Sequence, residues 1–178
     1  FIPPEHRIIT IENVSELDLA GHKHWIRLVA KLPNVENKGE IPLRTLVKNA
    51  LRMRPDRIIL GEARGGEALD VVQAMHSGHD GIMTVLHANS ARAALERFET
   101  LMLMSGLELP PQACRTQIAS AVDLVVHVSR FVDGTRRVAA ISQVLGASPQ
   151  EGFDMEDLFM FEAEGFTPDG RLKGICKY

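Results

Sequence analysis

The sequence has little that would tie it to a disulfide scaffold, a metal centre, a membrane or a nucleic acid. Its two cysteines, Cys114 and Cys176, lie far apart and form no CxxC pair, which argues against a disulfide framework or a zinc site and predicts reduced thiols. No apolar run approaches the roughly 20 residues needed to cross a bilayer, and residues 1–7 do not resemble a signal peptide. A net charge of -3 disfavours direct nucleic-acid binding. We therefore expect a cytoplasmic protein without a transmembrane segment.

The chain also lacks an initiator methionine. Its first residues, FIPP, are typical of a helix end that runs into a turn, so we expect the N-terminus to be a cut within a longer protein. The 178 residues, 45% of them apolar and 24% charged, fit one globular domain with a sizeable core.

Short β-branched runs alternate with segments of helical periodicity. We expect strands at residues 7–11, 25–29, 57–62 and 82–86, a loop at 32–40, and helices at 43–50, 68–75, 90–102 and 110–122. Further strands at 124–128 and 138–144 flank Asp133-Gly134, which predicts a two-residue hairpin, and residues 158–161 and 170–175 suggest a strand pair appended to the main sheet. The pattern predicts an α/β fold with a mainly parallel sheet and antiparallel strands at its C-terminal margin, divided into residues 1–145 and a tail at 146–178.

Polar residues follow three of the expected strands, namely Glu12, Glu62 and His87. Ligands of open α/β sheets bind beyond the carboxyl ends of the strands, and neighbouring strands lie about 4.8 Å apart. Two carboxylates there suit phosphoryl chemistry, because one can hold Mg²⁺ while the other orients the attacking water; an imidazole can sense the γ-phosphate. Taken singly, each is more typical of a solvated turn residue or a structural histidine, and periodicity alone does not name the reaction.

Four arginines surround the strand that leads to Glu62: Arg52, Arg54, Arg57 and Arg64. They fit a solvated basic rim and a set of phosphate or intersubunit contacts equally well. His76, His79 and His87 are spread over a helix end, a turn and a strand, a spacing that argues against a histidine metal site.

Three motifs in this order resemble the type II/type IV secretion-system ATPases over nearly the whole chain. TIENVSE (residues 10–16) is similar to the Asp box of that family, RIILGEAR (57–64) to its atypical Walker B strand, and GHDG (78–81) with TVLHAN (84–89) to its His box. LRMRPD (51–56) precedes the Walker B strand. The resemblance implies a RecA-like P-loop NTPase core.

Within the family the chain most resembles the CpaF-type branch, which powers assembly of Tad/Flp pili. The segments that carry this resemblance are RGGEA (64–68), GHDG (78–81), Ser129-Arg130 with Asp133-Gly134, and LFMFE (158–162). The resemblance implies ATP and Mg²⁺ as ligands, a homo-oligomeric ring, most simply a hexamer, and inner-membrane platform proteins as partners that hold the ring peripherally at the membrane.

The resemblance also assigns roles to individual residues. Glu12 polarises water, Glu62 supports Mg²⁺ through water, and His79 and His87 report the phosphate state. The candidates for phosphate or subunit-interface contacts are Arg44, Arg52, Arg54 and Arg64.

Two features depart from the family pattern. Asn13 stands where many members have Asp, which puts an accessory role of that position in doubt but not the role of Glu12. The phosphate-binding pattern GxxxxGK[ST] does not occur in the 178 residues, and family order places it just before Phe1.

Two other functions compete with pilus assembly. One is a conjugation or type IV secretion ATPase, against which the segment after Val144 argues. The other is a non-catalytic module that docks on a ring or on membrane platform proteins, consistent with the missing phosphate loop. A GxxxxGK[ST] pattern encoded within about 20 residues upstream of Phe1 would favour the enzyme.

The isolated 178-residue chain is expected to hydrolyse no ATP above background. Without the amides, the lysine and the hydroxyl of a phosphate loop, nucleotide binding is severely weakened, and loss of even one preorganised donor costs roughly 100- to 1000-fold in rate. Phosphate release from ATP by the purified chain measures this. Turnover at an ordinary enzymatic rate would contradict the expectation.

Overall fold

The computed structural model describes residues 2–79 and 81–178. Phe1, where we expect the cut, and Asp80 of the GHDG motif lie outside the described residues. The chain divides into two compact units, Phe1–Leu86 with Thr100–Leu109 and His87–Glu99 with Pro110–Tyr178, and each is treated by itself below. Within the described ranges, no helix is long and apolar enough to span a bilayer.

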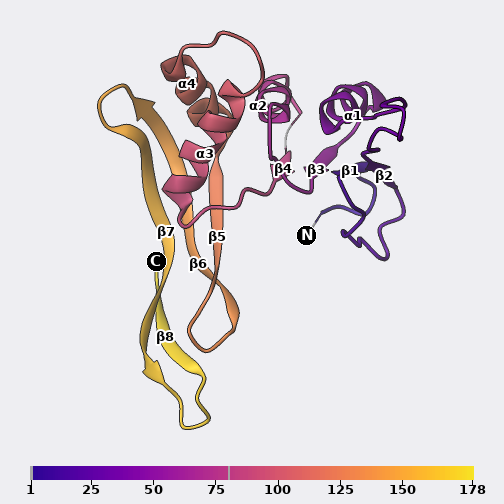
Figure 1. Ribbon diagram of the computed structural model, residues 1–178. Coiled ribbons are helices and arrows are strands. Elements are labelled where there is room, and N and C mark those ends of the chain that lie inside the picture. Colours follow the sequence, from indigo (N-terminus) through magenta and orange to yellow (C-terminus); the bar gives the residue numbers. More distant parts are fainter. Residues whose placement is uncertain (1, 80) are drawn as a thin grey trace. The chain divides into compact units, whose positions relative to one another are not determined.

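The first unit contains a four-stranded parallel sheet in the order β2-β1-β3-β4 (Figure 1). Its strands are β1 (Ile8–Glu12), β2 (Trp25–Val29), β3 (Arg57–Leu60) and β4 (Met83–Thr84). Every residue of β1 is buried, because this strand has β2 on one side and β3 on the other. The β-branched run around Ile9 thus becomes the central strand, as its composition predicts.

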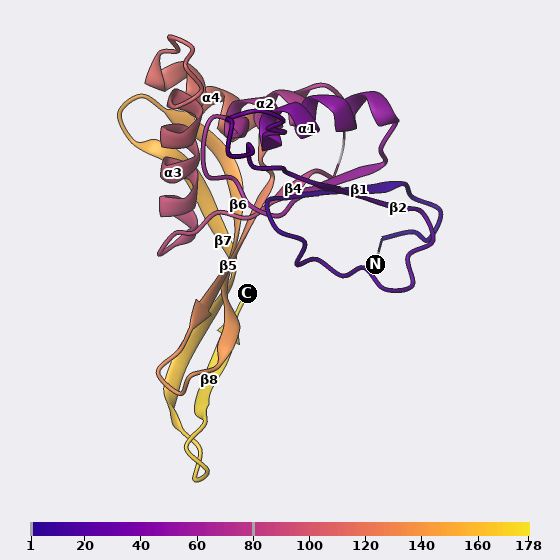
Figure 2. The same ribbon diagram turned by 45° about the vertical axis from the view of Figure 1, so that its right-hand side comes forward.

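Two helices lie together along the parallel sheet (Figures 1 and 2). In α1 (Leu43–Ala50) the buried residues recur at the predicted helical spacing of i, i+3, i+4 and i+7. The helix starts after Pro42, continues into the 3₁₀ turn η1 (Leu51–Met53), and ends where Arg54 adopts a left-handed φ of 57°. In α2 (Glu67–His76) nearly all of the first half is buried, including Asp70.

The strand β4 is shorter than the predicted segment 82–86. Among the described residues it pairs with β3 alone, and the last pair of that ladder is Leu60 with Thr84, although the Ala63 amide still donates to the Val85 carbonyl at 3.0 Å. His87 therefore lies three residues past the end of β4 rather than at the strand end.

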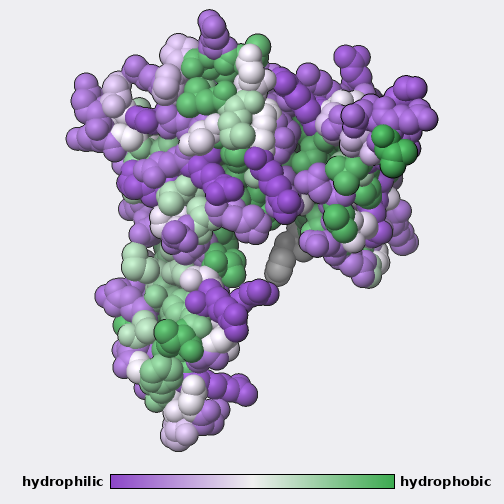
Figure 3. All heavy atoms as spheres, in the orientation of Figure 1, coloured by the Kyte–Doolittle hydropathy of each residue, from purple (hydrophilic) through white to green (hydrophobic). Residues whose placement is uncertain are grey.

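The second unit consists of helical segments and an antiparallel sheet in the order β5-β6-β7-β8. The strands are β5 (Leu124–Arg130), β6 (Arg136–Ser148), β7 (Gly152–Phe166) and β8 (Leu172–Lys177), and α4 (Pro111–Ala121) packs against β6 and β7. Helix α3 (Ala91–Leu103) begins in this unit. Apolar side chains such as Phe166 remain exposed on β7 and β8. Figure 3 shows apolar residues, in green, on the surface of this long ribbon.

Both cysteines are free thiols, as expected. Cys114 on α4 is buried, and desolvation together with the negative charge of Glu99 raises its pKa. Arg115 makes two hydrogen bonds of 3.0 and 3.1 Å to Glu99, joining α4 to α3 within the second unit.

The predicted α/β class with parallel and antiparallel strands is confirmed, but the antiparallel strands form a sheet of their own instead of extending the parallel one. β6 and β7 are much longer than predicted, and β6 includes residues 145 and 146, where the sequence suggested a boundary and where the register with β7 shifts between Val144 and Gly146. Pairing with two neighbours keeps β6 extended past its apolar core, which a local pattern does not reveal.

The predicted hairpin at Asp133-Gly134 is present, with three loop residues instead of two. Phe131 and Thr135 close the turn, the Gly134 amide donates to the Phe131 carbonyl, and Gly134 has a φ of 81°. The positive φ of Gly134 is a left-handed conformation, which favours glycine at the end of a three-residue hairpin loop.

Asp133 ties this turn to the start of β8. Its carboxylate accepts hydrogen bonds from the Leu172 amide at 2.8 Å and the Thr135 hydroxyl at 2.7 Å, and it pairs with Arg137 at 3.0 Å. The Leu172 amide, followed by the Thr135 hydroxyl, lowers the pKa of Asp133 to about 2 from its usual 3.8. Two hairpins distant in sequence are thus held together by one carboxylate.

The Asp133→Asn variant is expected to unfold at a lower temperature than the wild type above about pH 4. Because the pKa of Asp133 is lower in the folded state than its unfolded value of 3.8, ionised Asp133 stabilises the fold above that pH. This stabilisation is lost as the pH falls toward 2, so the difference in melting temperature between the two proteins shrinks between pH 3.8 and 2. Thermal unfolding followed by circular dichroism from pH 2 to 6 measures it. Asp169→Asn, at an exposed ion pair with Arg171, is the matched control.

Candidate functional site

Glu12 is a buried carboxylate at the carboxyl end of the central strand β1, with only 3% of its surface exposed. Its Oε1 accepts hydrogen bonds from the backbone amides of Glu16 at 2.8 Å and Leu17 at 2.7 Å. Its Oε2 is buried and has no hydrogen-bond partner among residues 2–79 and 81–178. One oxygen is therefore fixed by the protein, while the other retains its capacity to accept a hydrogen bond.

The end of β3 lies directly beside Glu12. The Gly61 amide donates to the Ile11 carbonyl at 2.8 Å, and a Cβ placed on Gly61 would be 3.2 Å from Cγ of Glu12. Glycine at this strand end thus allows the close approach of the Glu12 side chain. Glu62 follows at once, so the two carboxylates stand at neighbouring strand ends, as the sequence predicts.

Glu62 pairs with Arg64, whose Nε lies 2.6 Å from Oε2 of Glu62. The next turn is organised by Glu67, whose Oε1 accepts the amides of Arg64 at 2.6 Å and Gly65 at 2.9 Å. Arg64 is largely exposed. Arg64 is thus held through its backbone amide, while its side chain stays largely exposed beside Glu62.

On the other side of β3, the strand β4 ends with Thr84, which is paired with Leu60. The Thr84 hydroxyl is buried and, within the described residues, has no hydrogen-bond partner. Thr84 is in register with Leu60, and Leu60 with Ile11, so the Thr84 hydroxyl belongs to the face of the sheet opposite to that of Glu12.

The two histidines lie in different surroundings. His79 is half-buried, and its Nδ1 is 2.9 Å from the Ser77 hydroxyl at the end of α2. His87 is exposed and belongs to the second unit, whereas Glu12 and Glu62 belong to the first. The convergence of His87 with the two carboxylates stays a prediction.

Arg44 holds two helices together. Its Nε lies 2.6 Å from Oδ2 of Asp70, which is 94% buried in α2, and its Nη1 donates to the Ser105 carbonyl at 3.2 Å. Lys48, one turn further along α1, lies 3.5 Å from Oδ1 of Asp70. These contacts account for the side chain of Arg44 without a ligand.

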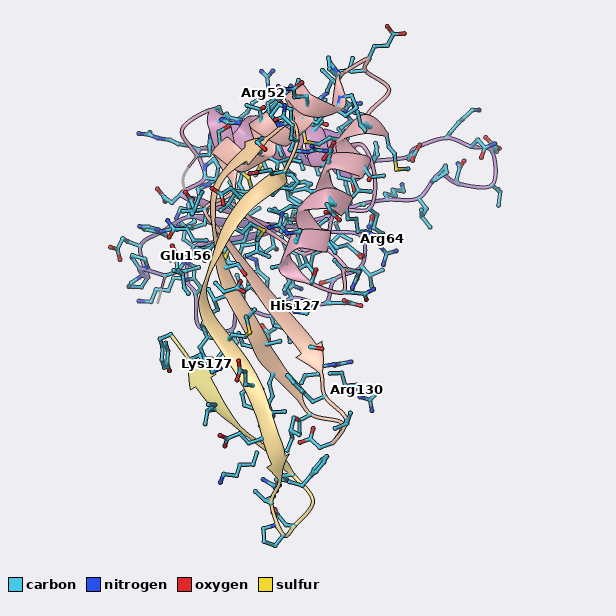
Figure 4. All side chains as sticks on the ribbon, turned by 90° about the vertical axis from the view of Figure 1, so that its left-hand side faces the viewer. Arg52, Arg64, His127, Arg130, Glu156 and Lys177 are labelled. Carbon is cyan, nitrogen blue, oxygen red and sulfur yellow. The ribbon has the colours of Figure 1, made fainter. Side chains whose placement is uncertain are left out.

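The other arginines do not form one cluster. Arg52 and Arg54 are exposed at and after η1, and Arg52 and Arg64 lie well apart (Figure 4). Arg57 lies across Gly81, since a Cβ on Gly81 would overlap its guanidinium, and its Nε is 3.4 Å from Nδ1 of His6. Arg57 thus packs at the start of β3, whereas Glu62 lies just past the end of this strand.

Reasoning from the sequence did not single out Gly61, Asp70 or Thr84. A glycine inside a strand and an acid among the apolar residues of α2 are local signals that could have identified the first two. Thr84 occurs in the sequence as the first residue of TVLHAN (84–89), but that its hydroxyl has no partner among the described residues is a property of the folded sheet.

Comparisons with known proteins identify the family of the chain. The family described as "Type II/IV secretion system protein" matches residues 1–157. A putative conjugal transfer protein of Mycobacterium tuberculosis is 42% identical over 141 residues, which cover 79% of this chain and 39% of that protein. The type IV secretion system protein VirB11 of Brucella suis is 40% identical over 140 residues, 76% of this chain and 39% of that protein. The chain thus spans about two-fifths of the length of these relatives.

Solved structures support the fold. The crystal structure of the VirB11 ATPase of Brucella suis, in complex with sulphate, superposes with a TM-score of 0.70 at 38% identity, over 79% of this chain and 40% of that chain. The pilus retraction motor PilT with bound ADP gives a TM-score of 0.52 at 23% identity, over 75% of this chain and 37% of that chain. At that identity PilT supports the RecA-like fold alone.

Replacing Asp70 by Ala is expected to destabilise the first unit by about 2 kcal/mol, because the variant leaves Arg44 and Lys48 without their buried counter-ion, with a discount for their partial exposure. Urea unfolding followed by fluorescence of Trp25, the single tryptophan, reports on this unit. Asp56→Ala, which removes an exposed acceptor of the Arg7 amide, is the control for loss of a carboxylate. An unchanged midpoint for Asp70→Ala would show that the ion pair does not stabilise the fold.

Proposed function

Since this chain belongs to the type II/IV secretion system protein family, we propose that it forms the water-activating half of a RecA-like motor domain that hydrolyses ATP. The observation that carries the proposal is the state of Glu12: a buried carboxylate at a strand end, oriented through Oε1 by two amides and unpartnered at Oε2. A carboxylate in this state suits the polarisation of an attacking water.

The proposed role of Glu62 is to hold Mg²⁺ through a water molecule. The residues fit such an ion, because Glu12 and Glu62 offer carboxylate oxygens, which are hard donors, at the carboxyl ends of neighbouring strands. When bound, Mg²⁺ would neutralise charge that develops on the transferred phosphate. Arg64, paired with Glu62, places a cation beside this site.

His79 and His87 are proposed to sense the phosphate, and the exposed Arg52 and Arg54 to contact phosphate or a neighbouring subunit. Arg44 is the weakest of the proposed ligands, because Asp70 and the Ser105 carbonyl already engage its guanidinium. Any phosphate contact by Arg44 would have to compete with that buried ion pair.

The parent protein is proposed to work as a homo-oligomeric ring, most simply a hexamer, on the cytoplasmic side of the inner membrane with platform proteins as partners. Two biological tasks fit. The CpaF-like segments, among them RGGEA (64–68) and LFMFE (158–162), favour assembly of Tad/Flp pili. The names of the relatives, a putative conjugal transfer protein and a type IV secretion system protein, favour conjugation or secretion at least as well.

A clean deletion of the gene discriminates between the two tasks. Loss of surface pili, with DNA transfer and protein secretion intact, supports the pilus motor. Loss of transfer or secretion, with pili intact, supports the alternative. Complementation with the wild-type gene is the control in each assay.

In the full-length gene product, Glu12→Gln is expected to lower kcat for ATP hydrolysis by about 100-fold or more while nucleotide binding persists, because the amide is a poor base of nearly the same shape. Steady-state phosphate release and binding of a fluorescent nucleotide measure the two effects.

Glu16→Gln is the matched control, since only the backbone amide of Glu16 contacts Glu12. Unchanged hydrolysis by the Glu12 variant would remove the proposed role of that residue. A wild-type protein that neither binds nor hydrolyses ATP would instead favour the non-catalytic interaction module.

A further inference from the structure

The orientation of Glu12 depends on the connection between β1 and β2, residues 13–24. This connection supplies both amides that hold Oε1, those of Glu16 and Leu17. It contains no helix or strand, so its own backbone ladder does not fix it. Some other contact has to hold the segment at Leu17 against the sheet.

Arg27 on β2 makes that contact. Its Nη2 donates to the Leu17 carbonyl at 3.2 Å. Leu17 is therefore held at both of its backbone groups, with its amide on Glu12 and its carbonyl on Arg27. The guanidinium is itself held, since its central carbon lies 4.2 Å from the centre of the Trp25 ring, within the range of a cation–π contact.

Trp25 is anchored in turn to the central strand. Its indole Nε1 donates to the Thr10 hydroxyl at 2.9 Å, and Thr10 is fully buried. The parallel register pairs Thr10 with Arg27, and alternation along β1 places Thr10 and Glu12 on the same face. On one face of β1 and β2, the contacts thus connect Thr10 to Trp25, Trp25 to Arg27 and Arg27 to Leu17. The amide of Leu17 then binds Glu12, which lies on β1 like Thr10.

The position of Arg27 favours a role in the site over a role in the core. Arg27 is exposed on β2, which lies at the edge of the sheet, so its removal opens no cavity. Its backbone acceptor belongs to the residue whose amide orients Glu12. An exposed side chain with these contacts contributes little to global stability and much to local order.

We propose that Arg27, supported by Trp25, is a positioning residue that holds the Glu12 carboxylate in its water-activating orientation. This inference rests on the proposed ATPase function. Without Arg27 the segment around Leu17 loosens, Oε1 loses part of its amide support, and Oε2 no longer points in one direction. A less well oriented Glu12 stabilises the transition state less but does not alter ATP binding, so kcat falls and KM for ATP stays nearly unchanged.

The test compares four variants of the full-length gene product: Arg27→Ala, Arg27→Lys, Trp25→Phe and the control Lys23→Ala, an exposed cation of the same connection. In Arg27→Ala we expect the Leu17 and Glu16 amides to exchange hydrogen about 5-fold faster and kcat to fall about 10-fold, a fraction of the effect of a general base. KM for ATP should stay within about 2-fold. Arg27→Lys, which keeps a donor for Leu17, should recover part of kcat.

Trp25→Phe keeps an aromatic face under Arg27 and loses only the hydrogen bond to Thr10, so its kcat should lie between those of Arg27→Ala and the wild type. Lys23→Ala should match the wild type in exchange and kcat. Unchanged Leu17 exchange in Arg27→Ala, or unchanged kcat while the wild type is active, overturns this inference alone. A wild type without ATP hydrolysis overturns the proposed function and this inference together.

Discussion

The burial of the Glu12 carboxylate is the constraint on which the rest of the first unit depends. A buried carboxylate is costly unless its oxygens find donors, and only Oε1 has them here, in the amides of Glu16 and Leu17. Gly61, the residue that follows β3, leaves room for this side chain because it has no Cβ to collide with it. The fold thus keeps a buried carboxylate at a strand end, with one oxygen unsatisfied among the described residues, at a cost in stability. A function for this oxygen would explain that cost.

The groups around this acid are arranged by the parallel sheet itself. Because β1 and β3 run in the same direction, Glu12 and Glu62 lie at the carboxyl ends of neighbouring strands, while Arg57 and His6 meet at the opposite ends. The helices are held by a separate device, the Asp70 carboxylate between Arg44 and Lys48. Charge that aids chemistry and charge that aids stability are therefore carried by different residues of one small unit.

In the second unit, a carboxylate in a turn also binds backbone amides, and this carboxylate belongs to Asp133. Asp133 joins the β5–β6 hairpin to the first residue of β8, and Arg137 adds a contact to the ring of Phe161, 5.4 Å from its centre. In both units an acid accepts backbone amides at a connection between strands, those of Glu16 and Leu17 in the first unit and those of Thr135 and Leu172 in the second. Such bonds order connections that apolar packing cannot reach.

The sequence by itself determined the α/β class, the central strand with Glu12, the amphipathic helix at Leu43–Ala50, and the placement of Glu62 next to Glu12, because strand and helix periods and strand-end chemistry are local properties. The tertiary structure alone decided that the antiparallel strands form their own sheet, that β4 ends at Thr84, and that Arg44 pairs with Asp70. It also decided that Arg27 reaches Leu17. Each of these depends on which neighbour a strand or side chain meets across the fold, and contacts between distant residues leave no periodic trace in the chain.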